Sequence, residues 1–174
     1  MGAECTGKTS LVGELAAEFG AAVVPEVLRD WCHVQGRTPM AHEQAALMQA
    51  QIHQENEALA LVNKGRDAIV LCDTAPLLTA VYSLHYFADG SLLEAAHAHH
   101  RRYALTLWLQ PDLSWVADGW QRDGRAAQTA VHDLLAQQLA RQSSVVCVSG
   151  SGPARRQVAR AALLARVAEL QSVS

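Results

Sequence analysis

The sequence of 174 residues predicts an α/β fold, in which a parallel sheet is covered by helices on both faces. Short apolar runs rich in β-branched residues alternate along the chain with longer stretches whose apolar residues recur at helical spacing. Such alternation is typical of parallel strands, because a crossover helix must return the chain to the same end of the sheet before the next strand begins. We find no repeat and no linker, so the sequence predicts one domain over residues 1–174.

The expected elements follow from the hydrophobic period and from the residues that end helices. The first helix is expected over residues 8–19, because Gly20 stands at its C-terminal cap position. Polar residues directly after the strands would lie at the carboxyl end of the sheet, where open α/β folds bind their ligands. Further helices are expected over 42–63, 77–87, 91–100, 129–141 and 154–170, and strands over 22–25, 68–72, 104–109 and 144–148.

The composition argues against several classes of protein. Half of the residues are apolar and the net charge is only −3, which is untypical of a disordered chain or of a nucleic-acid-binding surface. No apolar stretch approaches the roughly 20 residues of a membrane helix, and no signal peptide is recognisable. We therefore expect neither a nucleic-acid nor a membrane partner. The four cysteines lack paired spacing, so we expect reduced core thiols in a cytoplasmic protein.

A glycine-rich motif opens the chain. Residues 2–9 read Gly-Ala-Glu-Cys-Thr-Gly-Lys-Thr and match G-x-x-x-x-G-K-[ST], the phosphate-binding loop or P-loop. Its glycines let successive amides face phosphate oxygens, the lysine adds charge, and the last threonine can ligate Mg²⁺. The helix that follows places its partial positive end under the same phosphates. The motif predicts ATP and Mg²⁺ as cofactors, with contacts from Gly2, Glu4, Cys5, Thr6, Gly7, Lys8, Thr9 and Ser10.

The strand that normally leads into such a loop is missing from the sequence. Only Met1 precedes Gly2, whereas a P-loop usually follows the central strand of its sheet. Either the start is truncated, or the sheet is built without this strand and leaves two strand edges uncovered. We expect truncation, and a P-loop NTPase-type sheet that lacks its first strand.

Two carboxylates and an arginine follow predicted strands. Asp73 ends the run over 68–72 and matches the acid that holds magnesium opposite a P-loop; the alternative is a simple cap of the segment that starts at Pro76. Glu26 could accept the proton of a substrate hydroxyl that attacks the terminal phosphate. Arg29 could pair with Glu26 or hold a substrate phosphate. The alternative for this pair is an exposed ion pair at a helix start.

Residues 115–128 are polar and glycine-punctuated, which is typical of a small lid. Arg122 and Arg125 would neutralise charge on the transferred phosphoryl group when this segment closes, although an ordinary surface loop has the same composition. Gly150 and Gly152 suit a backbone turn near an adenine ring, with Arg155 nearby, or an ordinary turn.

A group of basic residues lies near position 100. We interpret it as a solvated helix end whose cations favour the helix dipole, rather than as a metal site completed by an aspartate. The group comprises His97, His99, His100, Arg101 and Arg102.

With these motifs in place, the sequence resembles the nicotinamide riboside kinase domain of bacterial NAD-biosynthesis regulator proteins and the related single-domain P-loop ATPases and kinases. The resemblance runs along nearly the whole chain. It rests on residues 2–9, 24–30, around Gln51, 72–74 with Thr79 and Tyr82, 115–125 and 148–155.

The resemblance implies ATP-dependent phosphorylation of the 5'-hydroxyl of a pyridine riboside, in a kinase fold with a core and a lid. It implies that Lys8 and Thr9 serve ATP and Mg²⁺, and that Glu26, Arg29, Gln51, Asp73 and Thr74 face the acceptor. Arg122 and Arg125 would belong to the lid, and Lys8, Glu26 and Asp73 would share the catalytic work with them.

The sequence leaves two functions open. Ala75 and Pro76 replace the polar stretch expected after the Asp-Thr pair, so the acceptor is not fixed. The leading hypothesis is a small-molecule kinase with a nucleoside-like acceptor. The alternative is an ATP-binding regulatory ATPase or switch, in which bound nucleotide orders the lid for a partner protein. The sequence does not predict the oligomeric state.

Overall fold

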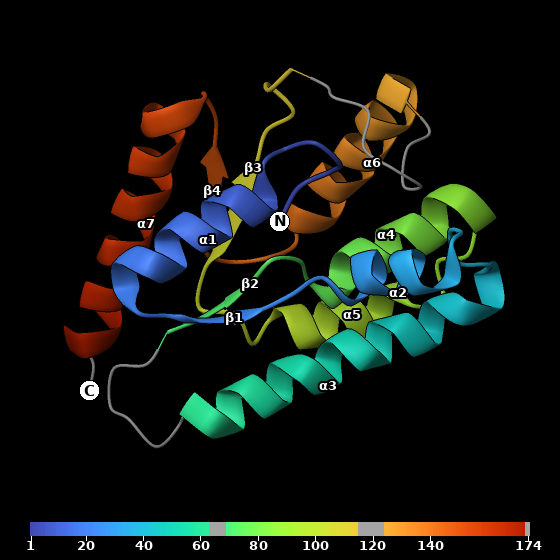
Figure 1. Cartoon of the computed structure of the whole chain (residues 1–174), viewed down its shortest axis with the longest axis horizontal. Helices are drawn as coiled ribbons and strands as arrows, with labels where there is room; N and C mark the ends of the chain where they lie inside the picture. Colours follow the sequence, from blue (N-terminus) through green and yellow to red (C-terminus); the bar gives the residue numbers. More distant parts are fainter. Residues whose placement is uncertain (63–68, 115–123, 173–174) are drawn as a thin grey trace.

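The computed structural model describes residues 1–62, 69–114 and 124–172. Over this part of the chain, helices and short strands alternate as the sequence predicts (Figure 1). The helices are α1 (Lys8–Phe19), α2 (Val27–Gln35), the 3₁₀ helix η1 (Ala41–Glu43), α3 (Gln44–Val62), α4 (Pro76–Phe87), α5 (Leu93–His100), α6 (Gly124–Leu139) and α7 (Gly152–Ser172). None of these helices has the length and apolar character that crossing a membrane requires.

The strands pair in parallel, which confirms the predicted fold class. Strand β1 (Ala22–Val24) pairs with β2 (Val70–Cys72), with Ala22 opposite Val70. Strand β3 (Thr106–Leu109) pairs with β4 (Val145–Val148), with Thr106 opposite Val145. The carboxyl ends of β1 and β2 therefore meet, and the residues that follow them are brought together.

Helices pack against these strands from several sides. Both α1 and α3 contact β1 and β2, while α7 packs on β4 and on α1. Figure 1 shows α3 running beneath β1 and β2, with α7 and α6 on opposite sides of the β3–β4 pair. Each pair of parallel strands is thus flanked by helices, as the alternation of elements predicts.

A cavity of about 110 Å³ separates β2 from β3. Among the described strands, no hydrogen bonds join the β1–β2 pair to the β3–β4 pair. Met1 lies at this boundary: its nitrogen donates to Leu107 O at 2.7 Å, and its carbonyl accepts from Leu109 N at 2.8 Å. A single residue thus pairs with β3, and among the described residues no strand lies between β2 and β3.

Two apolar clusters form the core. The larger one joins α3, α4 and α6 through residues such as Met48, Leu78 and Leu135, and it also takes in Ala3 of the glycine-rich loop. The smaller one joins α1, β3, β4 and α7. Since Ala3 is 0% exposed, its side chain anchors the glycine-rich loop in the core.

Several predictions need correction. Helix α2 was not expected, because its amphipathic pattern spans only nine residues, about two and a half turns. Helix α6 begins at Gly124, so residues 124–128 of the predicted lid form the first helical turn; residues 115–123 lie outside the described part. Cys147 is exposed rather than part of the core, and Cys5 and Cys72 are only half-buried.

The histidines near position 100 do not form a solvated helix end. His99 is 8% exposed and His100 is 3% exposed. His99 Nε2 lies 2.6 Å from Glu55 Oε2, and His100 Nε2 lies 3.0 Å from Thr106 Oγ1. In the described part of the chain, no group of three His, Cys, Asp or Glu side chains could hold a metal ion. These histidines therefore tie α5 to α3 and β3.

Burial lowers the pKa of His100 from 6.5 to about 4, with a smaller contribution from nearby positive charge. The unfolded chain therefore takes up a proton near pH 6.5 that the folded chain does not take up until about pH 4. We expect the free energy of unfolding to fall as the pH falls through this window, by up to about 1.4 kcal/mol per pH unit.

Urea unfolding across this pH range tests the prediction. His100→Gln keeps a hydrogen-bonding side chain beside Thr106 and should flatten the pH dependence. The control His53→Gln changes a histidine whose side chain is 73% exposed, and should leave the dependence as it is. An unchanged slope in the His100 variant would contradict the assignment.

Candidate functional site

The glycine-rich loop has the curled backbone that its sequence predicts. Cys5 and Gly7 have positive φ angles of 54° and 76°, so the backbone takes the left-handed conformation twice before α1 begins at Lys8. Gly2 is closely packed: a Cβ atom there would lie 2.6 Å from Thr6 Oγ1 and 2.9 Å from Leu109 O. Glycine is therefore required at position 2 by space and favoured at position 7 by conformation.

Side chains of the loop brace it from within. Thr6 Oγ1 donates to Ala3 O at 2.8 Å, and Lys8 Nζ donates to the same carbonyl at 3.0 Å. Lys8 is only 7% exposed, so its charge is held inside the loop rather than in solvent. This positions an ammonium group where a P-loop places its phosphate-binding lysine.

Arg155 braces the loop from outside. Its Nη2 donates to Thr6 O at 2.8 Å and to Gln110 O at 2.9 Å, while Nη1 donates to Gly150 O at 2.8 Å and pairs with Asp112. One buried guanidinium therefore joins the loop to the ends of β3 and β4. A contact between Arg155 and adenine stays a prediction. Both terminal nitrogens of its guanidinium already bond to the loop and to the residues after β3 and β4.

Helix α6 adds a further contact to the loop. Gln128 Nε2 donates to Glu4 O at 2.6 Å, although the two residues lie 124 positions apart. Arg125 lies one helical turn before Gln128 and is exposed, while Arg122 falls outside the described residues. The sequence analysis missed Gln128 and Asp112, because neither belongs to a recognisable motif.

Four predicted residues meet at the carboxyl ends of β1 and β2. Thr9 Oγ1 donates to Asp73 Oδ2 at 2.7 Å and accepts from Arg29 Nη1 at 2.7 Å. Arg29 Nη2 lies 3.1 Å from Glu26 Oε2, and Nη1 lies 3.7 Å from Asp73 Oδ2. Glu26 and Asp73 are 5% and 4% exposed, whereas the Arg29 side chain is 40% exposed, so the ion pair at the start of α2 is buried on the side of its carboxylates only.

Thr9 and Asp73 are suited to hold Mg²⁺. A hydroxyl and a carboxylate are the oxygen ligands that the ion uses at P-loops, together with phosphates and water. Asp73 Oδ1 is buried and has no hydrogen-bond partner among the described residues, which leaves one carboxylate oxygen available. The neighbouring Thr74 Oγ1 is likewise buried and without a partner.

Gln51 supports the site rather than lining it. Its Oε1 accepts from Val27 N, the first amide of α2, at 3.1 Å, and its Nε2 lies 3.4 Å from Glu55 Oε1. Gln51 is 2% exposed and both polar atoms of its amide have partners. It therefore fixes the start of the helix that carries Glu26, while direct contact with a substrate stays a prediction.

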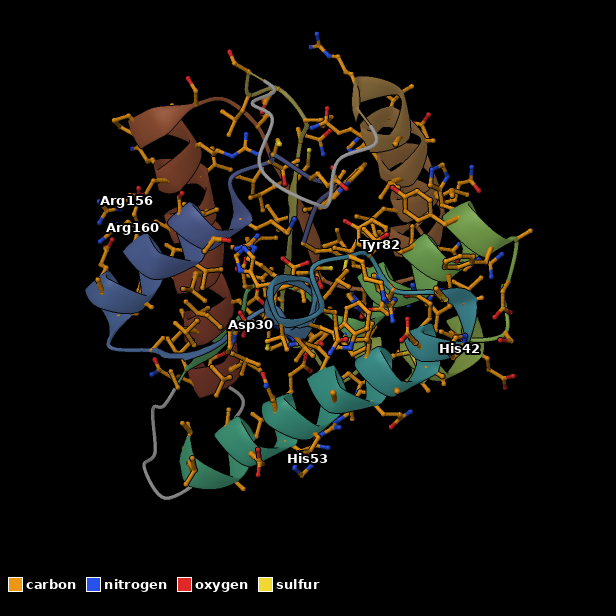
Figure 2. All side chains as sticks on the ribbon, turned by 45° about the vertical axis from the view of Figure 1, so that its right-hand side comes forward. Asp30, His42, His53, Tyr82, Arg156 and Arg160 are labelled. Carbon is orange, nitrogen blue, oxygen red and sulfur yellow. The ribbon has the colours of Figure 1, made fainter. Side chains whose placement is uncertain are left out.

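The remaining predicted residues lie at the rim. Ser10 is exposed on the first turn of α1, and Gly152, with a φ of 52°, begins α7. Figure 2 shows Arg156 and Arg160 on the outer side of α7; they pair with Glu18 of α1. These surface pairs hold the two helices that flank the loop side by side.

A covered parallel sheet, a glycine-rich loop at the start of α1 and an acid after β2 together define a P-loop nucleotide-binding domain. A family model described as an AAA domain matches residues 1–155, and the chain belongs to this P-loop NTPase-type family. No curated protein shows a significant match to the chain. The family implies nucleotide binding, usually with Mg²⁺, and does not specify a phosphoryl acceptor.

The packing around Gly2 generates a first test of the loop. In Gly2→Ala the new Cβ meets backbone at Leu109, so we expect roughly tenfold weaker ATP binding or worse, with a loss of about 1–3 kcal/mol in stability. The control Gly13→Ala adds a Cβ with nothing within 4 Å and should stabilise α1 by up to about 1 kcal/mol. ATP titration and urea unfolding measure both effects, and wild-type affinity in the first variant would contradict the packing argument.

The free oxygen of Asp73 generates a second test. Asp73→Asn keeps an acceptor for Thr9 but removes a negative charge, so we expect MgATP binding to weaken by roughly tenfold or more. Binding of ATP in the presence of a chelator should change much less. The control Asp30→Asn removes an exposed carboxylate from α2. Equal losses with and without Mg²⁺ would exclude Asp73 as the metal-holding acid.

Proposed function

We propose that this domain is an ATP-dependent kinase that phosphorylates a hydroxyl of a nucleoside-like acceptor, such as the 5'-hydroxyl of nicotinamide riboside. The placement of Glu26 carries the proposal. Its carboxylate is nearly buried and lies beside Arg29, which contacts both Thr9 and Asp73. A carboxylate next to the phosphate and metal site is what a kinase needs to accept a proton from its acceptor.

Each residue of the site has a distinct part in this proposal. MgATP, when bound, supplies the electrophilic phosphorus and the charge that neutralises its oxygens. Lys8 binds the phosphates, while Thr9 and Asp73 hold the metal. Glu26 accepts the proton of the acceptor hydroxyl, and Arg29 orients Glu26 and attracts phosphate oxygens. In this proposal Arg125, which lies on the first turn of α6, neutralises the same charge together with Arg122.

The proposed partner is a small molecule. A net charge of −3 does not favour a nucleic acid, and the apolar runs are strands and amphipathic helices rather than membrane segments. The free cysteines of the described structure fit a reducing compartment, so we place the domain in the cytoplasm.

A second function is favoured by the family itself. The match to an AAA domain fits an ATPase or switch that hydrolyses ATP without a small-molecule acceptor. In that case water, rather than a substrate hydroxyl, would stand beside Glu26. Only the presence of an acceptor in the reaction separates the two functions.

Turnover of a Glu26 variant tests the proposed chemistry. Glu26→Gln keeps the size of the side chain but removes its basicity, so we expect turnover to fall by roughly 10² or more while ATP binding persists. Lys8→Ala should instead abolish ATP binding, because it removes the charge held inside the loop. Unchanged turnover in Glu26→Gln would remove this carboxylate from the mechanism.

The acceptor is tested by measuring ATP consumption with nicotinamide riboside, with common nucleosides and with no acceptor. A kinase consumes ATP only when the right acceptor is present, and the phosphorylated product can be detected by mass. Equal consumption in every mixture, with release of inorganic phosphate, would favour the ATPase and contradict the kinase.

A further inference from the structure

A second cavity, of about 490 Å³, lies beside the loop and outside the phosphate and metal site. It is bounded by α2, by the segment between α2 and α3, by the start of α3 and by the last turns of α4. Its volume is typical of cavities that bind small molecules, which occupy roughly 300–1,000 Å³. Glu4 lines it, so the cavity opens directly next to the P-loop.

Aromatic side chains form one wall of this cavity. Tyr82, Tyr86 and Phe87 come from the last turns of α4, and the rings of Tyr82 and Tyr86 lie 6.1 Å apart with a tilt of 37°. Tyr86 and Phe87 are 40% and 37% exposed, and Met40 opposite them is 53% exposed. Large apolar side chains are rarely gathered at a solvent-accessible mouth unless they bind something. Rings in such positions offer faces and edges to a flat ligand.

Figure 2 places this wall in the molecule. Tyr82 lies inside the helical part, while His42, two residues after Met40 in the chain, lies at the outer edge of the same end. Tyr82 is 7% exposed, so it forms the inner part of the wall. The cavity therefore runs inward from the surface segment that precedes α3.

One residue that lines the cavity carries a buried polar atom without a partner in the described structure. Gln44, the first residue of α3, lines the cavity and is 3% exposed, and its Oε1 makes no hydrogen bond within the described structure. An unpaired buried amide oxygen costs about 1–3 kcal/mol unless a donor reaches it. A ligand with an amide or amino group would supply that donor.

The charges around the cavity disfavour an anionic ligand. Arg37 lines it, but both terminal nitrogens of its guanidinium bond to Glu43 at 2.7 Å, and its plane covers the Trp31 ring at 4.8 Å. Glu4 adds a carboxylate to the lining, and no second cation lines the described cavity. A neutral or positively charged ring therefore fits better than one that bears a carboxylate.

The cavity adjoins the helix that begins at the proposed catalytic carboxylate. Leu28 on the first turn of α2 lines the cavity, and Glu26 is the N-cap residue of the same helix. Glu4 of the P-loop also lines the cavity, so the cavity lies between the loop and the start of α2. A ligand whose ring occupies the cavity would extend its hydroxyl toward Glu26.

We propose that this cavity binds the flat, uncharged or cationic heteroaromatic ring of the phosphoryl acceptor, with Gln44 accepting a hydrogen bond from an amide or amino group on the ring. The role of the ring as part of an acceptor rests on the kinase proposed above. The cavity itself does not, because ring binding can be measured without ATP and without turnover.

Titration calorimetry with nicotinamide riboside, in the absence of ATP, tests ring binding directly. We expect saturable binding to the wild-type chain, and a loss of roughly tenfold or more in Gln44→Leu, which removes the acceptor at nearly constant volume. The matched control Gln54→Leu removes an amide from the same helix, one whose Oε1 also lacks a partner but which lies outside the cavity. It should bind as the wild type does.

A second variant keeps the test independent of the buried glutamine. Tyr86→Ala removes an exposed ring from the mouth, so the fold should persist, and we expect weaker binding by several-fold. Nicotinic acid riboside, which differs from the first probe by a carboxylate in place of the amide, should bind more weakly than nicotinamide riboside to the wild type. Urea unfolding confirms that each variant is folded.

The outcomes separate this proposal from the kinase. Absence of binding to the folded wild type, or an unchanged dissociation constant in both Gln44→Leu and Tyr86→Ala, overturns the ring site even if some other acceptor is phosphorylated. Binding that both variants weaken supports the ring site even if no product forms, and the kinase proposal alone then fails. Equal binding of the two ribosides would overturn the assigned role of charge and of the amide.

Discussion

The hydrogen bond between Thr9 Oγ1 and Asp73 Oδ2 is the contact on which the candidate site depends. It joins the first turn of α1 to the carboxyl end of β2, 64 positions further along the chain. Met1 adds only two backbone hydrogen bonds to β3, so the strands give the loop little support. This side-chain contact, the packing of α1 on β1 and β2, and the burial of Ala3 in the core together set the position of the loop relative to these strands.

The proposed catalytic carboxylate depends on a second set of buried contacts. Gln51 of α3 accepts from the first amide of α2, and Glu55, one turn further on, bonds to His99 and to Tyr103 at 2.6 and 2.7 Å. These groups are largely shielded from water. Hydrogen bonds are stronger in the protein interior than in water, so these contacts hold their geometry firmly. Glu26 is thus positioned by residues of α3, α5 and the segment before β3, none of which the phosphate or metal would touch.

The sequence predicted what depends on local pattern. Gly20 ends α1 at the expected residue, and the residues after β1 and β2 meet because parallel strands align their carboxyl ends. It did not predict α2, because nine residues span only about two and a half helical turns, too few to repeat a pattern; in the structure Gln51 holds the first amide of this helix. The bracing by Gln128 could not be foreseen either, since its partner is a backbone carbonyl in a distant segment and carries no sequence signal.

Arg155 stands 149 positions from Thr6, yet its guanidinium holds the Thr6 carbonyl together with those of Gln110 and Gly150. A residue of α7 in this way holds the glycine-rich loop at the start of the chain. A neutral residue at position 155 would leave three carbonyls without their common donor, and the nucleotide pocket would loosen although every residue of its motif stayed intact. Loss of function in this domain can therefore originate in α7, a helix that sequence comparison of the pocket alone would pass over.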